Sequence, residues 1–276
     1  MAKRFDGREV SLALQAELRA RVEQDRLRYV FPVLATIRIG AIPAAISYEK
    51  GLMRAAEATG VIVRRYILPA DTTQEDIAYL IEEINRDPLL SALLLFRPLP
   101  EGFDDSKLTA MIAPQKDIDC ANWAHLAQFI PCTAEACMQL LKHYGVDCQG
   151  KHAVVLGRSR TVGLPTAKEL LDANATVTVC QSLTPNPAIY ARQADILIAA
   201  VGRPGLVTRD FVKPGAVILD VGINRDPVTG ALCGDVCADE VEDLAAGLSP
   251  VPYGVGSVTS TILMRHVIEA AERAAK

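Results

Sequence analysis

Residues 154–165, VVLGRSRTVGLP, join an apolar run to a helix-forming run through a turn that carries Gly157 and Gly163. The apolar run indicates a buried strand, and the turn places the N-terminus of a helix, with its free backbone N–H groups, directly after that strand. In Rossmann-type sheets this arrangement holds the pyrophosphate of a dinucleotide. The glycines follow the pattern G-x-S-x-x-x-G and not G-x-G-x-x-G, so the turn by itself predicts only a tight strand-to-helix corner.

The sequence around this turn favours the dinucleotide interpretation. Runs typical of buried strands lie at residues 151–157, 175–180, 194–202 and 216–223, and residues 164–174 predict a helix. Strands and helices that alternate with short turns between them are typical of a parallel α/β sheet. The second half of the chain is therefore predicted to be a Rossmann-type domain.

Candidate cofactor residues lie at the ends of these strands. They are Gly157, Arg158 and Ser159 in the first turn, and Gly202, Gly222 and Ile223 after two later strands, where backbone must pass close to a flat ligand. An NAD-preferring enzyme has an Asp or Glu at the end of the next strand, but here Gln181 and Ser182 follow it. Arg158 and Ser182 supply a cation and a hydroxyl suited to a 2′-phosphate. The sequence thus favours NADP over NAD, with a solvated loop role for Arg158 as the alternative.

The first half of the chain alternates in the same way. Helices are predicted at residues 12–28, 44–59 and 73–86, and strands at residues 33–39, 61–68 and 91–96. Prolines make residues 97–131 irregular, so loops that form a site and a domain crossing are expected there. We therefore predict an α/β protein of two domains, residues 1–131 and 132–258, with the last helix, 259–276, packed on the first domain.

Composition argues against several classes of function. A formal net charge of −4 without a Lys/Arg cluster predicts neither nucleic acid nor an anionic membrane as a partner. The sequence has no uncharged run long enough to cross a bilayer and no signal-peptide pattern, so a cytoplasmic protein is expected. The seven cysteines fit reduced thiols, and neither they nor the four histidines have the spacing of a metal site.

Several ordered segments resemble the methylenetetrahydrofolate dehydrogenase/methenyltetrahydrofolate cyclohydrolase family. In chain order they are SYEKG, FRPLP, KDID, PCTAEA, GRSRTVGLPTAKELLDANATVTVCQSLT, AVILDVGIN and PVPYGVGSVT. They extend over nearly the whole chain, and several motifs in the same order are far more specific than any one. The resemblance implies an N-terminal α/β folate domain, a C-terminal Rossmann-type NAD(P)-binding domain, a cleft between them where pterin and nicotinamide meet, and a homodimer.

The resemblance also implies catalytic residues on the helix after the first strand. In the family a tyrosine stacks near the pterin, and a lysine four residues later acts in the cyclohydrolase proton transfers. Tyr48 matches the tyrosine, but Leu52 occupies the lysine position. Lys50 is only two residues from Tyr48, which turns it to another face of the helix, so it is a poor substitute. Without the resemblance, Tyr48 and Leu52 would be read as one apolar face packed in the core.

Two other segments that would bind substrate depart from the family pattern. Phe96 replaces the glutamine of the family's Q-L-P-L-P loop, and Tyr253 and Ser257 replace a glycine and a proline of its P-G-G-V-G-P segment. A bulky side chain is therefore expected where backbone approaches substrate. The substrate-binding residues implied by the resemblance are Tyr48, Leu52, Phe96, Asp119, Pro252, Tyr253, Gly254 and Gly256.

Asp119 is the second aspartate of the KDID segment and matches the family residue that binds the amino-pyrimidine edge of the pterin. A buried carboxylate that accepts two N–H donors makes a strong, directional contact. Tyr48 and Asp119 are thus the catalytic residues that the resemblance carries over. Asp119 read without it could be a loop cap.

We expect an NADP-dependent 5,10-methylenetetrahydrofolate dehydrogenase, because hydride transfer needs the orientation of two ligands more than it needs an acid or base. Hydrolysis of the methenyl product requires proton movement, and Leu52 and Phe96 occupy the positions that support it in the family. We therefore expect the cyclohydrolase activity to be weak or absent. The alternatives are an oxidoreductase for a different pterin or one-carbon carrier, and a non-catalytic NADP-binding relative.

Overall fold

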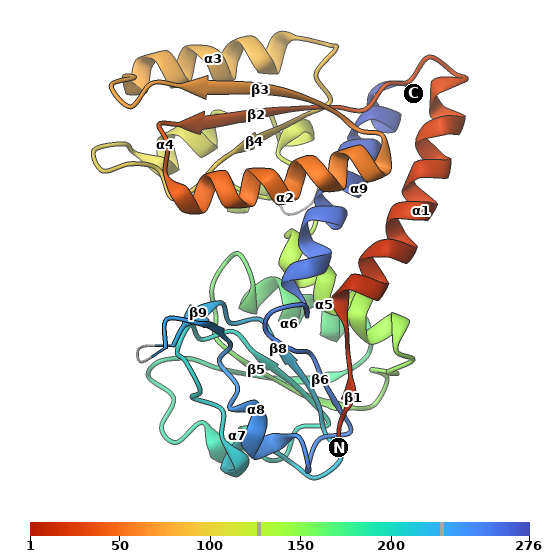
Figure 1. Cartoon of the computed structure of the whole chain (residues 1–276), viewed down its shortest axis with the longest axis vertical. Helices are drawn as coiled ribbons and strands as arrows, with labels where there is room; N and C mark the ends of the chain where they lie inside the picture. Colours follow the sequence, from red (N-terminus) through yellow and green to blue (C-terminus); the bar gives the residue numbers. More distant parts are fainter. Residues whose placement is uncertain (126–127, 227–228) are drawn as a thin grey trace. The chain divides into compact units, whose positions relative to one another are not determined.

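The structure is a computed structural model that describes residues 1–125, 128–226 and 229–276. It divides into two compact units. The large-sheet unit consists of Met1–Leu12 and Pro131–Thr259, and the small-sheet unit consists of Ala13–Ile130 and Ser260–Lys276. Helices α1 (Gly7–Arg26) and α9 (Gly256–Ala274) each have residues in both units (Figure 1).

The large-sheet unit contains a six-stranded sheet in the order β1-β11-β8-β7-β5-β6, whose neighbouring strands are all parallel. Helices α5 and α6 lie on one face of this sheet, and the short helices α7 and α8 lie on the other (Figure 1). The strands are β1 (Lys3–Arg4), β5 (His152–Leu156), β6 (Thr176–Cys180), β7 (Ile196–Ala199), β8 (Val217–Asp220) and β11 (Gly247–Leu248). The helices are α5 (Cys132–His143), α6 (Gly163–Asp172), α7 (Ala188–Ala191) and α8 (Ala238–Val241), and β9 (Asn224–Arg225) pairs with β10 (Leu232–Cys233) as an antiparallel ribbon.

Register aligns the carboxyl ends of the central strands. Leu156 of β5 is paired with Cys180 of β6, and Ala199 of β7 is paired with Asp220 of β8. The segments that follow these strands therefore emerge along one edge of the sheet, which is where open α/β sheets bind ligands.

The N-terminal boundary differs from the predicted one, because Met1–Leu12 belong to the large-sheet unit and not with the rest of the first half. Strand β1 pairs in parallel with β11, and the ring of Phe5 stacks on Tyr144 at a centroid distance of 4.2 Å. Phe5 also lies where a side chain at Gly247 would be. A strand of two residues has no measurable periodicity, so the hydrophobic pattern did not indicate it.

The small-sheet unit is built on three parallel strands in the order β3-β2-β4, with helix α3 on one face and α2 on the other (Figure 1). The strands are β2 (Val33–Ile39), β3 (Ile62–Leu68) and β4 (Ala92–Leu95), and the helices are α2 (Pro43–Thr59), α3 (Gln74–Arg86) and α4 (Asp105–Ala110), with short 3-10 turns at Pro114–Lys116 and Trp123–His125. Its core packs alternate residues of β2, such as Ile37 and Ile39, against Ile77 and Ile81 of α3. Burying such side chains contributes roughly 1.5–3 kcal/mol each before conformational entropy is counted.

Local signals determine where two of these helices begin or end. The Thr73 side chain accepts a hydrogen bond from the Asp76 N–H, and the Asp76 carboxylate accepts one from the Thr73 N–H, so α3 begins with a capping box. Gly60 ends α2 with a φ of 82°, a left-handed conformation that glycine adopts without strain.

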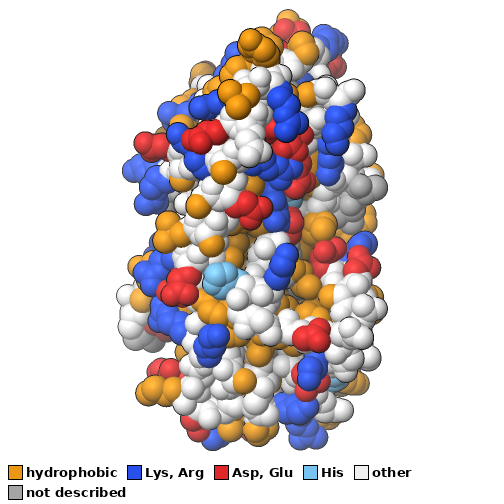
Figure 2. All heavy atoms as spheres, turned by 90° about the vertical axis from the view of Figure 1, so that its right-hand side faces the viewer, with side chains coloured by type: hydrophobic (Ala, Val, Ile, Leu, Met, Phe, Trp, Pro, Cys, Tyr) orange, Lys and Arg blue, Asp and Glu red, His pale blue; other side chains and the backbone are white. Residues whose placement is uncertain are grey.

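Charges of both signs are interspersed on the face of the molecule that Figure 2 presents. Within the described part of the chain, no helix has the length and apolar character needed to cross a membrane.

Candidate active site

Gly157 is required by the turn that follows β5. Its φ is +114°, and a Cβ at this position would overlap the carbonyl oxygen of Ala200, which follows the neighbouring strand. The Gly157 N–H donates to the carbonyl of Cys180 at 2.8 Å, which ties the ends of β5 and β6 together. The bare backbone of this turn fits a pyrophosphate that approaches closely.

The other predicted residues of this turn lie beside it. The Ser159 hydroxyl accepts hydrogen bonds from the N–H groups of Val162 at 3.1 Å and Gly163 at 3.4 Å, so it caps the first turn of α6. Arg158 and Ser182 are exposed, and they follow paired strands whose last residues are in register. The structure thus brings a guanidinium and a hydroxyl to neighbouring strand ends, as the sequence predicts.

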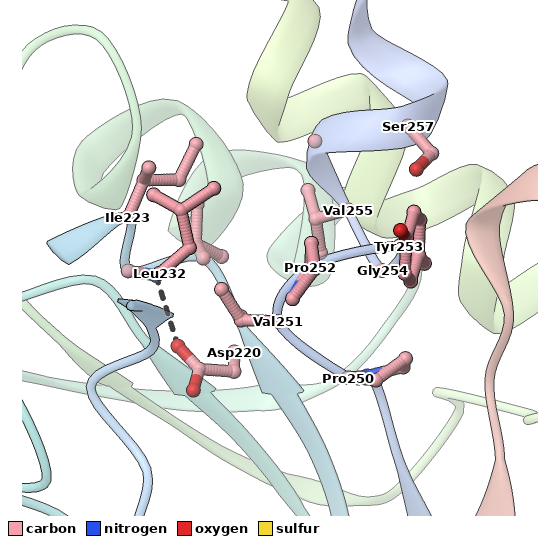
Figure 3. A pocket seen from close by; sticks show the side chains of 13 residues that line it. Asp220, Ile223, Leu232, Pro250, Val251, Pro252, Tyr253, Gly254, Val255 and Ser257 are labelled. Carbon is pink, nitrogen blue, oxygen red and sulfur yellow. Dashed lines mark hydrogen bonds between the residues drawn. The ribbon is translucent and has the colours of Figure 1, made fainter. Parts of the chain in front are cut away.

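A pocket of about 280 Å³ lies at the carboxyl end of β8 within the large-sheet unit (Figure 3). The segment after β8 forms one side of it and the segment before α9 the other, with Leu232 of β10 beside them. This one pocket is therefore lined both by candidate cofactor residues and by candidate substrate residues. They are Gly222 and Ile223 for the cofactor, and Pro252, Tyr253, Gly254 and Gly256 for the substrate.

Asp220, the last residue of β8, lies at the edge of this pocket and was not singled out from the sequence. Its carboxylate accepts hydrogen bonds from the N–H groups of Gly222, Asp235 and Val236 at 2.9 to 3.0 Å (the Gly222 bond is dashed in Figure 3). Burial raises the pKa of Asp220 to about 6, although the three N–H groups act in the opposite direction. Asp220 is therefore an anchor for the chain around the pocket.

Tyr253 lines this pocket, so its bulky side chain lies beside the segment that the resemblance assigns to substrate. Figure 3 shows it on the opposite side of Pro252 from Ile223. Its ring lies under the Arg8 guanidinium at 4.4 Å, and its carbonyl accepts a hydrogen bond from the Gly7 N–H at 2.7 Å. Its φ of 83° is unusual for a residue with a large side chain. The cation–π contact with Arg8, itself paired with Asp6, holds the ring away from Ile223.

In the small-sheet unit, the predicted catalytic helix α2 places its residues at different depths. Tyr48 is 40% exposed and meets the ring of Phe96 edge-on at a centroid distance of 5.7 Å. Leu52 is 0% exposed, so it belongs to the core, and Lys50 is exposed. Tyr48 and Phe96 thus form an aromatic pair. Leu52, at the position of the family lysine, is fully buried in the core.

A buried charge network beside these residues had no signal in the sequence. Glu49 of α2 accepts from Arg38 of β2 at 3.0 Å and from Arg65 of β3 at 2.9 Å, and the Arg38 and Glu49 side chains are buried. Arg38 also donates to the carbonyl of Gly40. The three side chains come from separate elements, so only the fold brings them together. They anchor α2 to the sheet.

The KDID segment differs from its predicted arrangement. The fully buried carboxylate is that of Asp117, which is 1% exposed and accepts from the N–H groups of Ala121 and Asn122 and contacts the His125 ring at 2.8 Å. Asp119, predicted as a buried carboxylate, is partly exposed. The loop thus uses its first aspartate for its own structure and presents the second closer to solvent.

Two further groups hold this segment in place. The imidazole of His266, from α9, lies 2.8 Å from the carbonyl of Ile118, the residue between the two aspartates, and burial lowers the pKa of His266 to about 4. The neutral ring therefore donates its Nδ1 proton to that carbonyl. The Lys116 ammonium donates to the carbonyls of Ile84 and Asp87 at the end of α3, and burial lowers its pKa. This buried lysine caps a helix and does not replace the family lysine.

The described residues contain no group of three or more His, Cys, Asp or Glu side chains that could hold a metal ion. Each of the seven cysteines is a free thiol.

Comparison with known proteins identifies the family. The family model for the catalytic domain of tetrahydrofolate dehydrogenase/cyclohydrolase matches residues 5–119, and the model for its NAD(P)-binding domain matches residues 131–275. This chain belongs to the tetrahydrofolate dehydrogenase/cyclohydrolase family. The family prediction is confirmed, and so is the prediction of an α/β catalytic domain followed by a Rossmann-type NAD(P)-binding domain.

Individual relatives of this family match over almost their full length. The bifunctional protein FolD of Carboxydothermus hydrogenoformans is 41% identical over 99% of this chain and 98% of its own. The crystal structure of the bifunctional FolD methylenetetrahydrofolate dehydrogenase/cyclohydrolase from Campylobacter jejuni has a TM-score of 0.95 at 34% identity, with 99% of both chains covered. The Trypanosoma brucei FolD structure, complexed with NADP cofactor and an inhibitor, has a TM-score of 0.92 at 37% identity, with 100% of this chain and 99% of its own covered.

Proposed function

We propose that this protein is an NADP-dependent 5,10-methylenetetrahydrofolate dehydrogenase of one-carbon metabolism. The observation that carries the proposal is the pocket at the end of β8, which is lined both by Gly222 and Ile223, assigned to the cofactor, and by Pro252–Gly256, assigned to the substrate. The nicotinamide ring that accepts the hydride and the folate that donates it have to lie next to each other. This pocket is lined by residues assigned to both ligands. Its relatives are named as bifunctional folate enzymes, and one of them holds NADP.

The cofactor residues in this proposal follow the edge of the six-stranded sheet. Gly157 and Ser159 would receive the pyrophosphate at the turn before α6, and Arg158 and Ser182 would receive the 2′-phosphate. The bare backbone at Gly157 and the open space beside Gly202, where an added Cβ would meet nothing within 4 Å, fit a bound dinucleotide. NADP, when bound, supplies the hydride acceptor.

The folate residues in this proposal act by orientation. Tyr48, backed by the buried ring of Phe96, offers an apolar edge for the pterin, and Asp119 offers a carboxylate for its amino-pyrimidine N–H groups. Pro252, Gly254 and Gly256 supply backbone at the pocket. Because Leu52 is buried and cannot donate a proton, these residues support hydride transfer better than hydrolysis.

The proposal includes a homodimer in the cytoplasm. Free thiols at every cysteine suit a reducing compartment. Sedimentation of the purified protein would give its oligomeric state.

Calorimetry with tetrahydrofolate and with NADP, followed by an assay of NADPH absorbance with methylenetetrahydrofolate, tests the proposed function. Binding of both ligands and formation of NADPH would support it. Binding of both without turnover would favour another pterin or one-carbon carrier as substrate. NADP binding without folate binding would point to a non-catalytic relative.

Arg158→Ala is expected to weaken NADP binding far more than NAD binding, because only NADP carries a phosphate that the guanidinium can pair with. A charge-assisted hydrogen bond contributes roughly 1.5–3 kcal/mol, so the preference for NADP should fall on the order of tenfold or more. The dissociation constants of both cofactors measure this. Arg192→Ala, which removes another exposed arginine of the large-sheet unit, is the control. Equal losses for NADP and NAD would make Arg158 a structural residue.

Asp119→Asn is expected to weaken folate binding and to leave NADP binding near the wild-type value, because Asp119 belongs to the small-sheet unit and the candidate cofactor residues belong to the large-sheet unit. The amide keeps the shape but loses the charge and one acceptor, which costs roughly tenfold in folate affinity. Calorimetry with each ligand decides. Full folate affinity in this variant would remove Asp119 from the substrate site.

A further inference from the structure

Asp235 is a buried carboxylate among the loops that follow β7 and β8, and no sequence motif described above includes it. It is 0% exposed. One oxygen accepts from the N–H groups of Val201 at 2.6 Å and Gly202 at 3.0 Å. The other accepts from the Arg203 N–H and from the Asn224 Nδ2, both at 2.8 Å. These four partners are uncharged N–H groups.

The partners of Asp235 come from two adjacent strand ends. Val201–Arg203 follow β7, and Asn224 begins β9 shortly after β8. Strands β7 and β8 pair directly, with Ala199 opposite Asp220. One buried carboxylate therefore fixes the distance between the backbone that leaves β7 and the backbone that leaves β8.

The Asp235 side chain is tightly packed against the backbone around it. A Cβ at Gly222 would overlap the Asp235 carboxyl group, so the chain after β8 lies directly against it. The Asp235 N–H donates to Asp220 at 3.0 Å, which couples the two buried carboxylates through backbone. Burying a carboxylate without a cation is costly unless N–H donors satisfy it, and here all four donors belong to segments at the ligand-binding edge.

The strand order indicates which part of a bound dinucleotide would lie beside the segments that Asp235 joins. The candidate pyrophosphate turn follows β5, and Ser182, a candidate residue for the 2′-phosphate of the adenosine half, follows β6. Strands β7 and β8 lie on the other side of β5 from β6, so the nicotinamide half of a bound dinucleotide would extend toward β7 and β8. Gly202, Gly222 and Ile223 lie on that side.

We infer that Asp235 is a positioning residue for the nicotinamide half of NADP: its carboxylate holds residues 201–203 and 222–224 at the separation that the ring requires. The inference rests on the proposed function. Asp235 touches backbone and Asn224 and acts on the cofactor only through them.

Asp235→Asn is the direct test. The amide has the size of the carboxylate, but its NH₂ group faces two N–H donors in either orientation of the side chain. We expect the dissociation constant for NADP to rise about tenfold or more and the rate of hydride transfer to fall, with folate affinity unchanged.

Asp195→Asn is the matched control for a loss of stability alone. Asp195 accepts from the His152 N–H at 3.0 Å and from Lys213 at 2.6 Å, and it precedes β7, at the opposite edge of the same sheet. We expect this variant to lower Tm and to bind NADP as the wild type does. Unchanged NADP binding in a folded Asp235→Asn protein would overturn the inference.

Asn224→Ala keeps the test decisive if Asp235→Asn fails to fold. It removes one of the four donors and leaves the backbone bonds in place. NADP affinity should fall about threefold, and equal affinity in this variant would overturn the inference. Wild-type protein that binds no NADP at all would instead reject the proposed function.

Discussion

The purified protein is expected to convert methylenetetrahydrofolate and NADP into the methenyl form and to release it, with hydrolysis no faster than in buffer. General acid–base catalysis contributes about 10²- to 10⁴-fold, and the residue that would supply it in the family is here a leucine with 0% exposure. Tyr48 presents ring surface that can orient a pterin, and the buried ring of Phe96 packed against it has no group that could activate water. Absorbance of NADPH and of the methenyl compound, followed together, separates the two steps.

Leu52→Lys is expected to restore part of the hydrolysis. Position 52 is fully buried, and an ammonium placed there loses hydration, so its pKa falls and a fraction of the lysine is neutral at pH 7. Phe96 still occupies the position of the glutamine. Leu52→Met, which keeps an apolar side chain of similar volume, is the control and should hydrolyse no faster than the wild type.

Rapid hydrolysis by the wild type would contradict this expectation, because another group would then supply the proton path. Absence of hydride transfer with any folate would instead favour the alternative substrates or a non-catalytic role.

Gly157→Ala is expected to weaken NADP binding strongly and to destabilise the large-sheet unit. The left-handed backbone costs a side-chain residue about 1–2 kcal/mol, and the added Cβ would overlap the Ala200 carbonyl, so the free energy of unfolding should fall by about 3 kcal/mol or more. Displacing this turn also moves the N–H groups that receive the pyrophosphate, which should weaken NADP on the order of 100-fold. Thermal unfolding and calorimetry measure the two effects.

Gly150→Ala is the matched control, since Gly150 has a φ of 71° but an added Cβ there would meet nothing within 4 Å. It should cost about 1 kcal/mol and leave NADP binding unchanged. If both variants lose the same stability and both bind NADP, the close approach at Gly157 has no role in the site.

Much of the fold could be predicted from local patterns. The strand predicted at residues 33–39 coincides with β2, and the helix predicted at residues 73–86 coincides with α3 and its N-cap Thr73. The predicted helix at residues 12–28 begins earlier, at Gly7, because the turn at Asp6–Gly7 depends on contacts with the segment before α9. Hydrophobic periodicity and helix capping depend on residues a few positions apart, so they can be predicted from the local sequence.

The sequence by itself determined the family, the α/β class and the dinucleotide turn, because these depend on residues within short segments or on several motifs in order. Only the tertiary structure decided that β1 joins the large sheet, that Tyr253 turns toward Arg8, and that the carboxylate of Asp235 ties two strand ends together. Each of these joins residues that lie in separate segments of the chain. Such contacts form when the whole unit packs, and no local pattern encodes their partners.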